Sequence, residues 1–485
     1  MSLSTSRRAF LTTGGLTVAG LGVSASVSPT AASARSAQAQ TASADPSRPA
    51  LPRISPAPDS GLHLDPRAFG AKGDGTAKDT HAVQAALDRC AVLGGGEVTI
   101  AGGTFLVGAI RIGSNTTLRI APDGVIQGSP DVADYPLMQV RWEGRWVPGY
   151  VGLVWAQDAR NIAIAGGGLI VASDAIPGRT DRVSGLRHPA LLEFVTCQGV
   201  SVTDVRTQQN DMWSTHPVYC DDVLFRNVSI KGRADGIDLD SCRRVHIDHC
   251  DFDTVDDCIS LKSGRGLEGN LIGRPTEDVT ITDCTFRDQR WACIGIGSET
   301  SGGIRRVLVE RCQCLAAHTF AIYIKSRPGR GAFIEDVTMR DLDVQNAGYG
   351  FLRINILDSG KQDQFPVPGL DGIPTVRNFV FERIRVTDVP ILVEAYQFHP
   401  DKPLDGLTLR DITGTSGKGL SLANIKNAVL ENVEVNVFSG PRLSIDNVTG
   451  QGLDGAARLI PVERPPPVVA TVPPYTLGMM SGPPN

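Results

Sequence analysis

Nine short segments of this chain repeat one pattern of apolar and polar residues. In each segment the second, fourth and seventh residues are apolar, and most of the others are polar. The shortest steps between neighbouring segments are 21 to 23 residues, and the longer steps fit the same unit with an inserted loop. The nine segments are 199–207, 222–230, 244–252, 278–286, 306–314, 336–344, 378–386, 406–414 and 427–435.

Alternating apolar and polar residues predict β-strands with one buried face. A period in the low twenties predicts that each unit is one turn of a solenoid, which buries its apolar face only against neighbouring turns. Leucine-rich repeats have a similar period but carry leucine at fixed positions, and a β-sandwich spaces its strands more closely. We therefore expect an all-β fold, a right-handed parallel β-helix.

The open end of a solenoid exposes unpaired strand edges, so a capping element is expected near the N-terminus. Asp79 and Thr80 are candidates for the start of a helix, and Val83, Leu87 and Cys90 follow at helical spacing. This pattern predicts an N-terminal capping helix that covers the first coil.

Composition divides the chain into four parts. The first contains Arg7 and Arg8 followed by a weakly apolar, glycine-rich run, which is typical of a bacterial twin-arginine signal peptide. We therefore expect a periplasmic or secreted protein. The four parts are the signal peptide (1–39), a linker rich in Ala, Ser and Pro (40–62), the parallel β-helix catalytic domain (63–460) and a proline-rich tail (461–485).

Composition also limits the partners and ligands. The formal net charge of -5 is too small to predict a nucleic-acid partner. After removal of the signal peptide, no segment reaches a membrane-spanning length, so no membrane contact is expected. The ten cysteines lack the paired spacing of a zinc site, and most fall in or beside the repeated motifs. We expect free, buried thiols, no cofactor and no bound metal, while the oligomeric state is not indicated.

In "TVDDCISLKSG" two aspartates, Asp256 and Asp257, directly precede an apolar segment. Asp235 lies 21 residues before the first and 22 before the second, which is the length of one coil. Residues one coil apart lie above each other with roughly 4.8 Å between backbones, so three carboxylates are expected on one face. Their repulsion raises the pKa of at least one, which then keeps a proton near neutral pH. Cleavage of a glycosidic bond requires such an acid beside ionised carboxylates.

Two other roles are open for these carboxylates. Aspartates in β-helix turns hydrogen-bond to the backbone, and three clustered carboxylates also suit a calcium ion. Lys262 lies five residues after Asp257, and Lys325 is expected two coils further on. Their positive charges argue against the calcium site.

Four motifs occur in order along the chain: "ADGIDLDSC", "TVDDCISLKSG", "IGIGSETSGGIRRV" and "YIKSRPGRG". Together they resemble glycoside hydrolase family 28, the polygalacturonase-like, pectin-degrading β-helix family, over about 69–448. The resemblance implies inverting hydrolysis of an acidic, pectin-like polysaccharide or oligosaccharide. It also implies that Asp256 protonates the leaving oxygen, that Asp235 and Asp257 activate water, and that Lys325 holds a uronate carboxylate.

The chain departs from the family pattern at three positions. Arg233 stands where the family has Asn, Trp291 or Ala292 where it has His, and Tyr323 where it has Arg. These departures leave polygalacturonan, a rhamnogalacturonan-type glycan and other acidic glycans open as substrates.

Four further residues are candidates for substrate binding, and two other functions stay open. The candidates are His216, Glu299, Tyr323 and Arg330, with a turn histidine or solvated loop charges as the alternatives. A polysaccharide lyase on the same fold would need an Arg or Lys base, usually with calcium. A non-catalytic carbohydrate-binding β-helix has no use for repelling carboxylates. The insert 350–375 would favour exo cleavage if it walls off one end of the groove.

Overall fold

The computed structural model describes residues 48–55, 61–209, 211–287 and 291–460. The predicted signal peptide and proline-rich tail lie outside these residues, so twin-arginine export and the boundaries of both segments stay predictions. Within the described ranges, no helix is long and apolar enough to cross a membrane.

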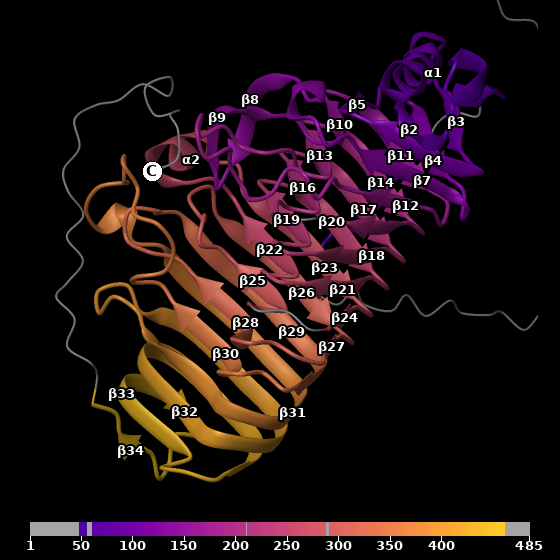
Figure 1. Cartoon of the computed structure of the whole chain (residues 1–485). Coiled ribbons are helices and arrows are strands. Elements are labelled where there is room, and N and C mark those ends of the chain that lie inside the picture. The colour runs from indigo at the N-terminus through magenta and orange to yellow at the C-terminus, as the bar shows by residue number, and fades with distance from the viewer. Residues whose placement is uncertain (1–47, 56–60, 210, 288–290, 461–485) are drawn as a thin grey trace, which may run out of the picture. The chain divides into compact units, whose positions relative to one another are not determined.

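The predicted right-handed parallel β-helix is confirmed, and its coils stack along one axis (Figure 1). Each coil contributes strands to three parallel ladders, in which a strand pairs with its counterparts in the coils before and after it. Ladder A, which carries the candidate site, contains β5 (Ile110–Arg111), β10 (Val154–Gln157), β13 (Leu192–Val195), β16 (Thr215–Val218), β19 (Ile237–Asp240), β22 (Ile259–Lys262), β25 (Ile294–Ile296), β28 (Phe320–Lys325) and β30 (Gly350–Asn355).

The other two ladders hold the repeated segments. Ladder B contains β1 (His63–Leu64), β3 (Gly96–Ile100), β6 (Thr116–Ile120), β11 (Arg160–Ala165), β14 (Gln198–Thr203), β17 (Asp221–Arg226), β20 (Arg243–Asp248), β23 (Thr276–Thr282) and β26 (Ile304–Glu310). Ladder C contains β2 (Asp74–Lys78), β4 (Gly103–Val107), β7 (Gly124–Gly128), β12 (Leu169–Val171), β15 (Arg206–Gln208), β18 (Ser229–Gly232), β21 (Asp251–Thr254), β24 (Thr285–Phe286) and β27 (Gln313–Cys314).

Towards the C-terminus the strands run on through the bends, so one strand serves two or more ladders. These are β29 (Phe333–Gln345), β31 (Thr375–Gln397), β32 (Leu404–Val437) and β33 (Leu443–Gln451), followed by β34 (Ala457–Arg458). One antiparallel hairpin, β8 (Leu137–Trp142) with β9 (Arg145–Tyr150), and a short helix, α2 (Gly266–Ile272), interrupt the coils.

The bend between ladders B and C is the same in all nine repeats. The sixth residue of each repeat has a positive φ, a conformation that Asn and Asp adopt more readily than most residues. We call these residues the turn stack: Asp204, Asn227, His249, Asp283, Arg311, Asp341, Arg383, Asp411 and Asn432.

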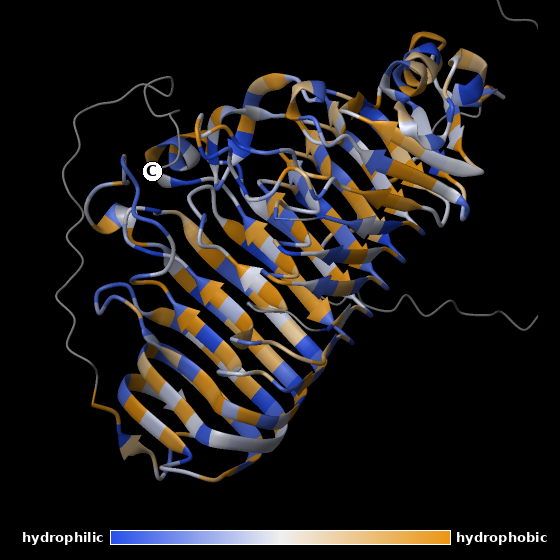
Figure 2. Ribbon diagram, viewed as in Figure 1, coloured by the Kyte–Doolittle hydropathy of each residue, from blue (hydrophilic) through white to orange (hydrophobic). Residues whose placement is uncertain are grey.

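The core lies inside the coils, where apolar side chains of one coil pack on those of the next. Figure 2 shows hydrophobic and hydrophilic residues alternating along the strands. Val223, Val245, Val279 and Val307, which are the second residues of four repeats, are at most 1% exposed. All ten cysteines are buried and free, which confirms the prediction of buried thiols.

Helix α1 (Thr80–Val92) forms where a helix was predicted, with Val83, Leu87 and Cys90 on its buried face. It contacts β3, β5 and β6. Asp79 lies at the N-cap position but does not cap the helix, because its carboxylate accepts hydrogen bonds from the backbone N–H groups of Lys72 and Gly73 at 2.7 and 2.9 Å. The role of α1 as the end cap of the solenoid stays a prediction.

Part of the predicted linker, residues 48–55, lies against ladder B. The Arg48 guanidinium is 2.9 Å from Glu310, and the backbone N–H of Arg53 donates to Asp222 at 2.8 Å. This segment therefore crosses several coils on the outside of the solenoid.

Candidate active site

Asp235 and Asp257 precede two neighbouring strands of ladder A. Strand pairing places Ile237 opposite Ile259, and the backbone N–H of Gly236 donates to the carbonyl of Asp257 at 3.0 Å. This register places Asp235 beside Asp257 on the next coil. Asp256 is the immediate neighbour of Asp257, so the structure brings all three predicted carboxyl groups to one place.

A hydroxyl and two lysines surround the buried pair Asp235 and Asp257, which are 4% and 3% exposed. The Oγ atom of Ser260 is 3.1 Å from an oxygen of each carboxylate. Lys262 Nζ is 3.2 Å from Asp235, and Lys325 Nζ is 2.7 Å from Asp257. Burial alone would raise the pKa of Asp235, but nearby cations, Lys262 first, outweigh it and hold that pKa below its ordinary value.

Asp256 has the opposite character. Burial, and after it repulsion from Asp235 and Asp257, raises its pKa from the ordinary 3.8 to about 6. The side chain is 21% exposed, and Arg179 Nη2 lies 2.5 Å from its Oδ2 atom. The guanidinium opposes the upward shift without cancelling it. Asp256 is thus the carboxyl of the three that solvent reaches and that holds a proton near pH 6.

Lys325 and Tyr323 lie on β28, two coils beyond Asp256 and Asp257. The pairing of β22 with β25 and of β25 with β28 places them there. The Lys325 ammonium lies 5.3 Å from the centre of the Tyr323 ring, and the tyrosine hydroxyl is 2.7 Å from Ser359 Oγ. Tyr323 therefore links the site to the insert that contains Ser359.

His216 is buried at 1% exposure. Its Nδ1 atom is 3.4 Å from Glu193, and its ring centroid is 4.2 Å from that of Trp213. Burial lowers the pKa of His216. The Trp213 ring lies 5.2 Å from Lys262 Nζ, so His216 is connected to the site through Trp213. Its predicted contact with substrate stays a prediction.

Glu299 and Arg330 are also buried and contact protein groups. Arg330 donates to Asp363 at 2.6 Å and to the carbonyl of Lys361 at 3.0 Å. Burial alone would raise the pKa of Glu299, but the charges of Lys262 and Arg330 lower it. Substrate binding by either residue stays a prediction, and the observed contacts of Arg330 anchor the insert.

The three departures from the family pattern have distinct surroundings. The backbone N–H of Ala292 donates to Asp257 Oδ1 at 3.0 Å, and the neighbouring Trp291 is 45% exposed. Arg233 Nε lies 2.8 Å from Asp211, on the loop before β16. Ala292 therefore keeps a contact with the site through its backbone alone.

Sequence reasoning missed Arg179 and Ser260. Arg179 is 77 residues before Asp256 and lies in the irregular segment between β12 and β13, outside the nine repeats. No motif marks it. Ser260 does stand in the "TVDDCISLKSG" motif, two residues before Lys262. Its place on the same face as Lys262, opposite the core residue Ile259, could have been deduced from the alternation of β22.

The insert after β30 meets the β8–β9 hairpin beside the site. Lys361 of the insert lies 2.9 Å from Glu143 at the hairpin turn. Arg265, which precedes α2, joins both, at 2.9 Å from Asp363 and 3.4 Å from Glu143. From the hairpin itself, Arg141 pairs with Asp240 at 2.8 Å. Ion pairs thus tie three insertions from distant parts of the sequence to one another and to ladder A.

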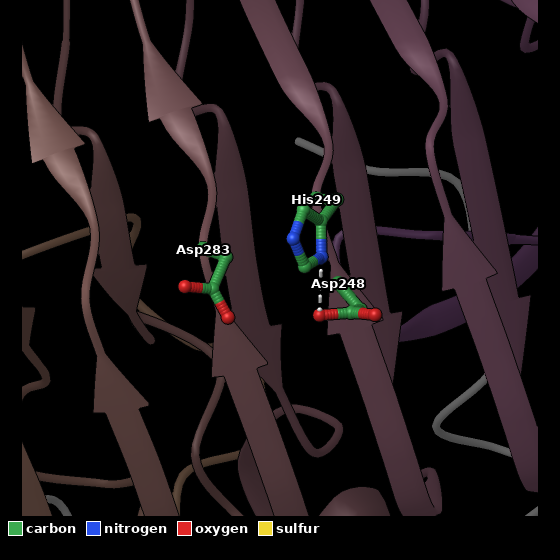
Figure 3. A group of neighbouring side chains, drawn as sticks. All are labelled: Asp248, His249 and Asp283. Atoms are coloured by element: carbon green, nitrogen blue, oxygen red, sulfur yellow. Dashed lines mark hydrogen bonds and ion pairs between the residues drawn. The ribbon is translucent and has the colours of Figure 1, made fainter.

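A second group with possible metal ligands, Asp248, His249 and Asp283, lies at the turn stack (Figure 3). His249 Nδ1 lies 2.9 Å from Asp248. Arg226 is 3.0 Å from Asp248, and Arg311 is 2.7 Å from Asp283. Because each carboxylate already pairs with an arginine, these residues fit a ladder of surface ion pairs better than a metal site.

Comparisons with known proteins point to one family. The family model "Glycosyl hydrolases family 28" matches residues 154–428. A probable polygalacturonase of Vitis vinifera is 25% identical over 364 residues, covering 71% of this chain and 72% of the relative. An exo-poly-alpha-D-galacturonosidase of Dickeya chrysanthemi is 22% identical over 452 residues, covering 79% and 73%.

Solved structures are also similar to most of the chain. An exopolygalacturonase of Thermotoga maritima has a TM-score of 0.65 and 25% identity, covering 79% of this chain and 94% of the other. A family 28 exopolygalacturonase of Yersinia enterocolitica has a TM-score of 0.60 at 18% identity, covering 82% and 79%, and supports the fold. The family model spans more than half of the chain, and so this protein belongs to glycosyl hydrolases family 28 and is a glycoside hydrolase.

Proposed function

We propose that this hydrolase cleaves uronate-containing glycans of the pectin type with inversion at the anomeric carbon. The observation that carries the proposal is the contrast within the carboxyl cluster. Asp256 has a pKa of about 6 and is partly open to solvent, whereas Asp235 and Asp257 are buried and paired with lysines. A protonated acid beside fixed carboxylates is the arrangement that glycoside hydrolysis uses.

In the proposed reaction, Asp256 donates its proton to the leaving oxygen. Asp235 and Asp257 accept a proton from the water that attacks the anomeric carbon from the opposite face. An inverting mechanism needs roughly 6.5–9.5 Å between acid and base carboxyl groups, which leaves room for that water. The hydroxyl of Ser260 and the ammonium of Lys325 would keep the base carboxylates oriented.

Positive charge beside the acid supports an anionic sugar as substrate. Lys325, at 17% side-chain exposure, can reach a uronate carboxylate while it stays near Asp257. Arg353 occupies the next coil in register with Tyr323, and its guanidinium lies 5.5 Å from the tyrosine ring. A cation is therefore present near the position where the family motif has arginine. Polygalacturonan is the substrate named for the relatives, and it is the first to test.

Exo cleavage fits the insertions that meet beside the site. The insert after β30, the β8–β9 hairpin and the segment before α2 are joined by ion pairs at Glu143 and Asp363. A wall there would stop a chain from extending past the acid, so products would be released from one end.

The surroundings of the lysines disfavour a lyase. Burial alone would lower the pKa of Lys262 and of Lys325, but the neighbouring aspartates outweigh it and raise both values. Both amines are therefore held protonated and make poor bases for abstracting the proton beside a uronate carboxylate.

The test uses polygalacturonate and a rhamnogalacturonan as substrates. We expect new reducing ends, no ultraviolet absorbance from unsaturated uronate, and short products of a single size. Nuclear magnetic resonance of the first product should show inverted configuration. Unsaturated products would identify a lyase, retained configuration would exclude the inverting mechanism, and a ladder of product sizes would exclude exo action.

A further inference from the structure

Among the residues that the structure describes, three cations contact the carboxyl cluster, and Arg179 is the most exposed of them. Its side chain is 39% exposed, compared with 17% for Lys325 and 11% for Lys262. Its guanidinium nevertheless lies 2.5 Å from Asp256, the proposed acid. An incoming anion can therefore reach Arg179 before it reaches either lysine.

The backbone at Arg179 is held on both sides while its side chain reaches out. The N–H of Gly178 donates to Asp211 at 2.7 Å, and the N–H of His188 donates to the carbonyl of Arg179 at 3.0 Å. Asp211 is held in turn by Arg233, at 2.8 Å. Arg233, which stands where the family pattern has Asn, thus supports the loop that places Arg179 over the acid.

The contact between Arg179 and Asp256 conflicts with the proposed role of the acid. A guanidinium favours the ionised carboxylate, whereas a general acid must carry a proton when the bond breaks. Asp235, Asp257 and Lys325 also face Asp256, and Asp235 and Glu143 act on Arg179. If Arg179 left Asp256 for another anion, the repulsion from the two aspartates would act with less opposition.

We propose that Arg179 binds a carboxylate of the substrate and leaves Asp256 as it does so. The exchange lets Asp256 take up a proton from solvent once an anionic sugar is in place, so substrate binding readies the acid. This inference rests on the proposed function, in which Asp256 is the acid and the substrate is a uronate. A planar guanidinium can bind the sugar carboxylate through two hydrogen bonds, which an ammonium cannot.

The experiment compares Arg179→Ala, Arg179→Lys and the wild type on a galacturonate oligosaccharide and on its methyl ester. Arg182→Ala is the matched control, because Arg182 is an exposed arginine on the same loop. Loss of a charge-assisted pair should raise KM for the acid substrate about 10- to 100-fold in Arg179→Ala. The preference for acid over ester should fall by a similar factor, with Arg179→Lys between and Arg182→Ala unchanged.

The pH profiles give a second readout that a merely structural role would not produce. In the wild type, the alkaline limb of kcat should lie at higher pH than that of kcat/KM, because Arg179 has left Asp256 in the complex. In Arg179→Ala the kcat/KM limb should move to higher pH and meet the kcat limb. Melting temperatures check that both variants fold.

Two outcomes distinguish a failure of the proposed function from a failure of the role of Arg179. If the wild type cleaves neither the acid nor the ester, the proposed function fails and this inference falls with it. If the wild type cleaves the acid substrate but Arg179→Ala keeps its KM, its acid preference and its pH limbs, the proposed function stands and the role of Arg179 is overturned.

Discussion

Aspartates lie at stacked positions in two regions of this solenoid, the turn stack and the candidate site, and the two regions differ in what lies next to each carboxylate. In the turn stack, Asp283 pairs with Arg311 at 2.7 Å and Asp341 with Arg383 at 2.8 Å, each partner one coil away. At the candidate site, the residue one coil from Asp235 is another aspartate, Asp257, and the cluster is mostly buried.

Stacking of coils does not by itself decide whether a group of carboxylates is functional. A parallel β-helix places like positions above each other, so the residue types decide whether charges cancel or repel. Alternating Asp with Arg or Asn at the surface gives weak, screened stabilisation. At the candidate site, burial and, after it, repulsion from Asp235 and Asp257 raise the pKa of Asp256 and prepare it for proton transfer.

The largest expected effect is a loss of turnover that occurs at the candidate site and not at the turn stack. Asp256→Asn should reduce kcat by about 10²–10⁴-fold, because the amide has no proton to donate to the leaving oxygen. The matched control, Asp248→Asn in the surface group of Figure 3, should leave kcat within about twofold. Turnover is measured as reducing ends released from polygalacturonate. Full activity in Asp256→Asn would remove the site assignment.

The pH dependence of the wild-type activity tests whether Asp256 acts in its protonated form. Asp256 must be protonated to act, and its pKa is raised to about 6. We therefore expect kcat/KM to fall about tenfold per pH unit above this value. A profile that rises through pH 6 to 8 would show that the ionised form of this carboxyl is the active one.

Stability should respond with opposite signs in the two stacks. Because the folded-state pKa of Asp256 is raised, its ionisation destabilises the fold as pH rises from about 4 through 6. Asp256→Asn should raise the free energy of unfolding at pH 7 by on the order of 2 kcal/mol, and by little at pH 3.5.

Asp341 of the turn stack is the opposite case. A hydrogen bond from Arg383 lowers its pKa, so its contribution is present near pH 7 and is lost as pH falls. Asp341→Asn should lower the free energy of unfolding at pH 7 by less than about 1 kcal/mol, since the pair is partly solvated. Urea unfolding of both variants at pH 7 and pH 3.5 measures these differences. If both substitutions changed the free energy of unfolding at pH 7 in the same direction, the expected difference between the two regions would be wrong.

The smallest expected effect concerns metal. The carboxylates of Asp248 and Asp283 are each paired with an arginine, so calcium should not displace those partners. We expect the melting temperature to shift by less than about 1 °C on adding millimolar calcium or a chelator. A clear rise with calcium that disappears in Asp283→Asn would establish a metal site there.

Much of the fold and part of the site were accessible from the sequence. The alternation of residues such as Val223 and Val245 predicts the strands, and their spacing predicts the stacking, because both patterns are local. The same spacing led to Asp235 and Asp257 as neighbours. The buried positions of His216, Glu299 and Arg330 were not accessible, because burial of a polar side chain depends on partners far away in the sequence.

By itself the sequence determined the solenoid, its ladders and the aspartates one coil apart, since each follows from a period repeated along the chain. Lys262 and Lys325 were also accessible from the sequence, whereas only the tertiary structure decided that Arg179 reaches the cluster. Arg179 comes from a loop 77 residues before Asp256, and the insert after β30 meets the β8–β9 hairpin through Lys361 and Glu143. Irregular loops have no period, so the place where their side chains end is set by folding of the coils that carry them.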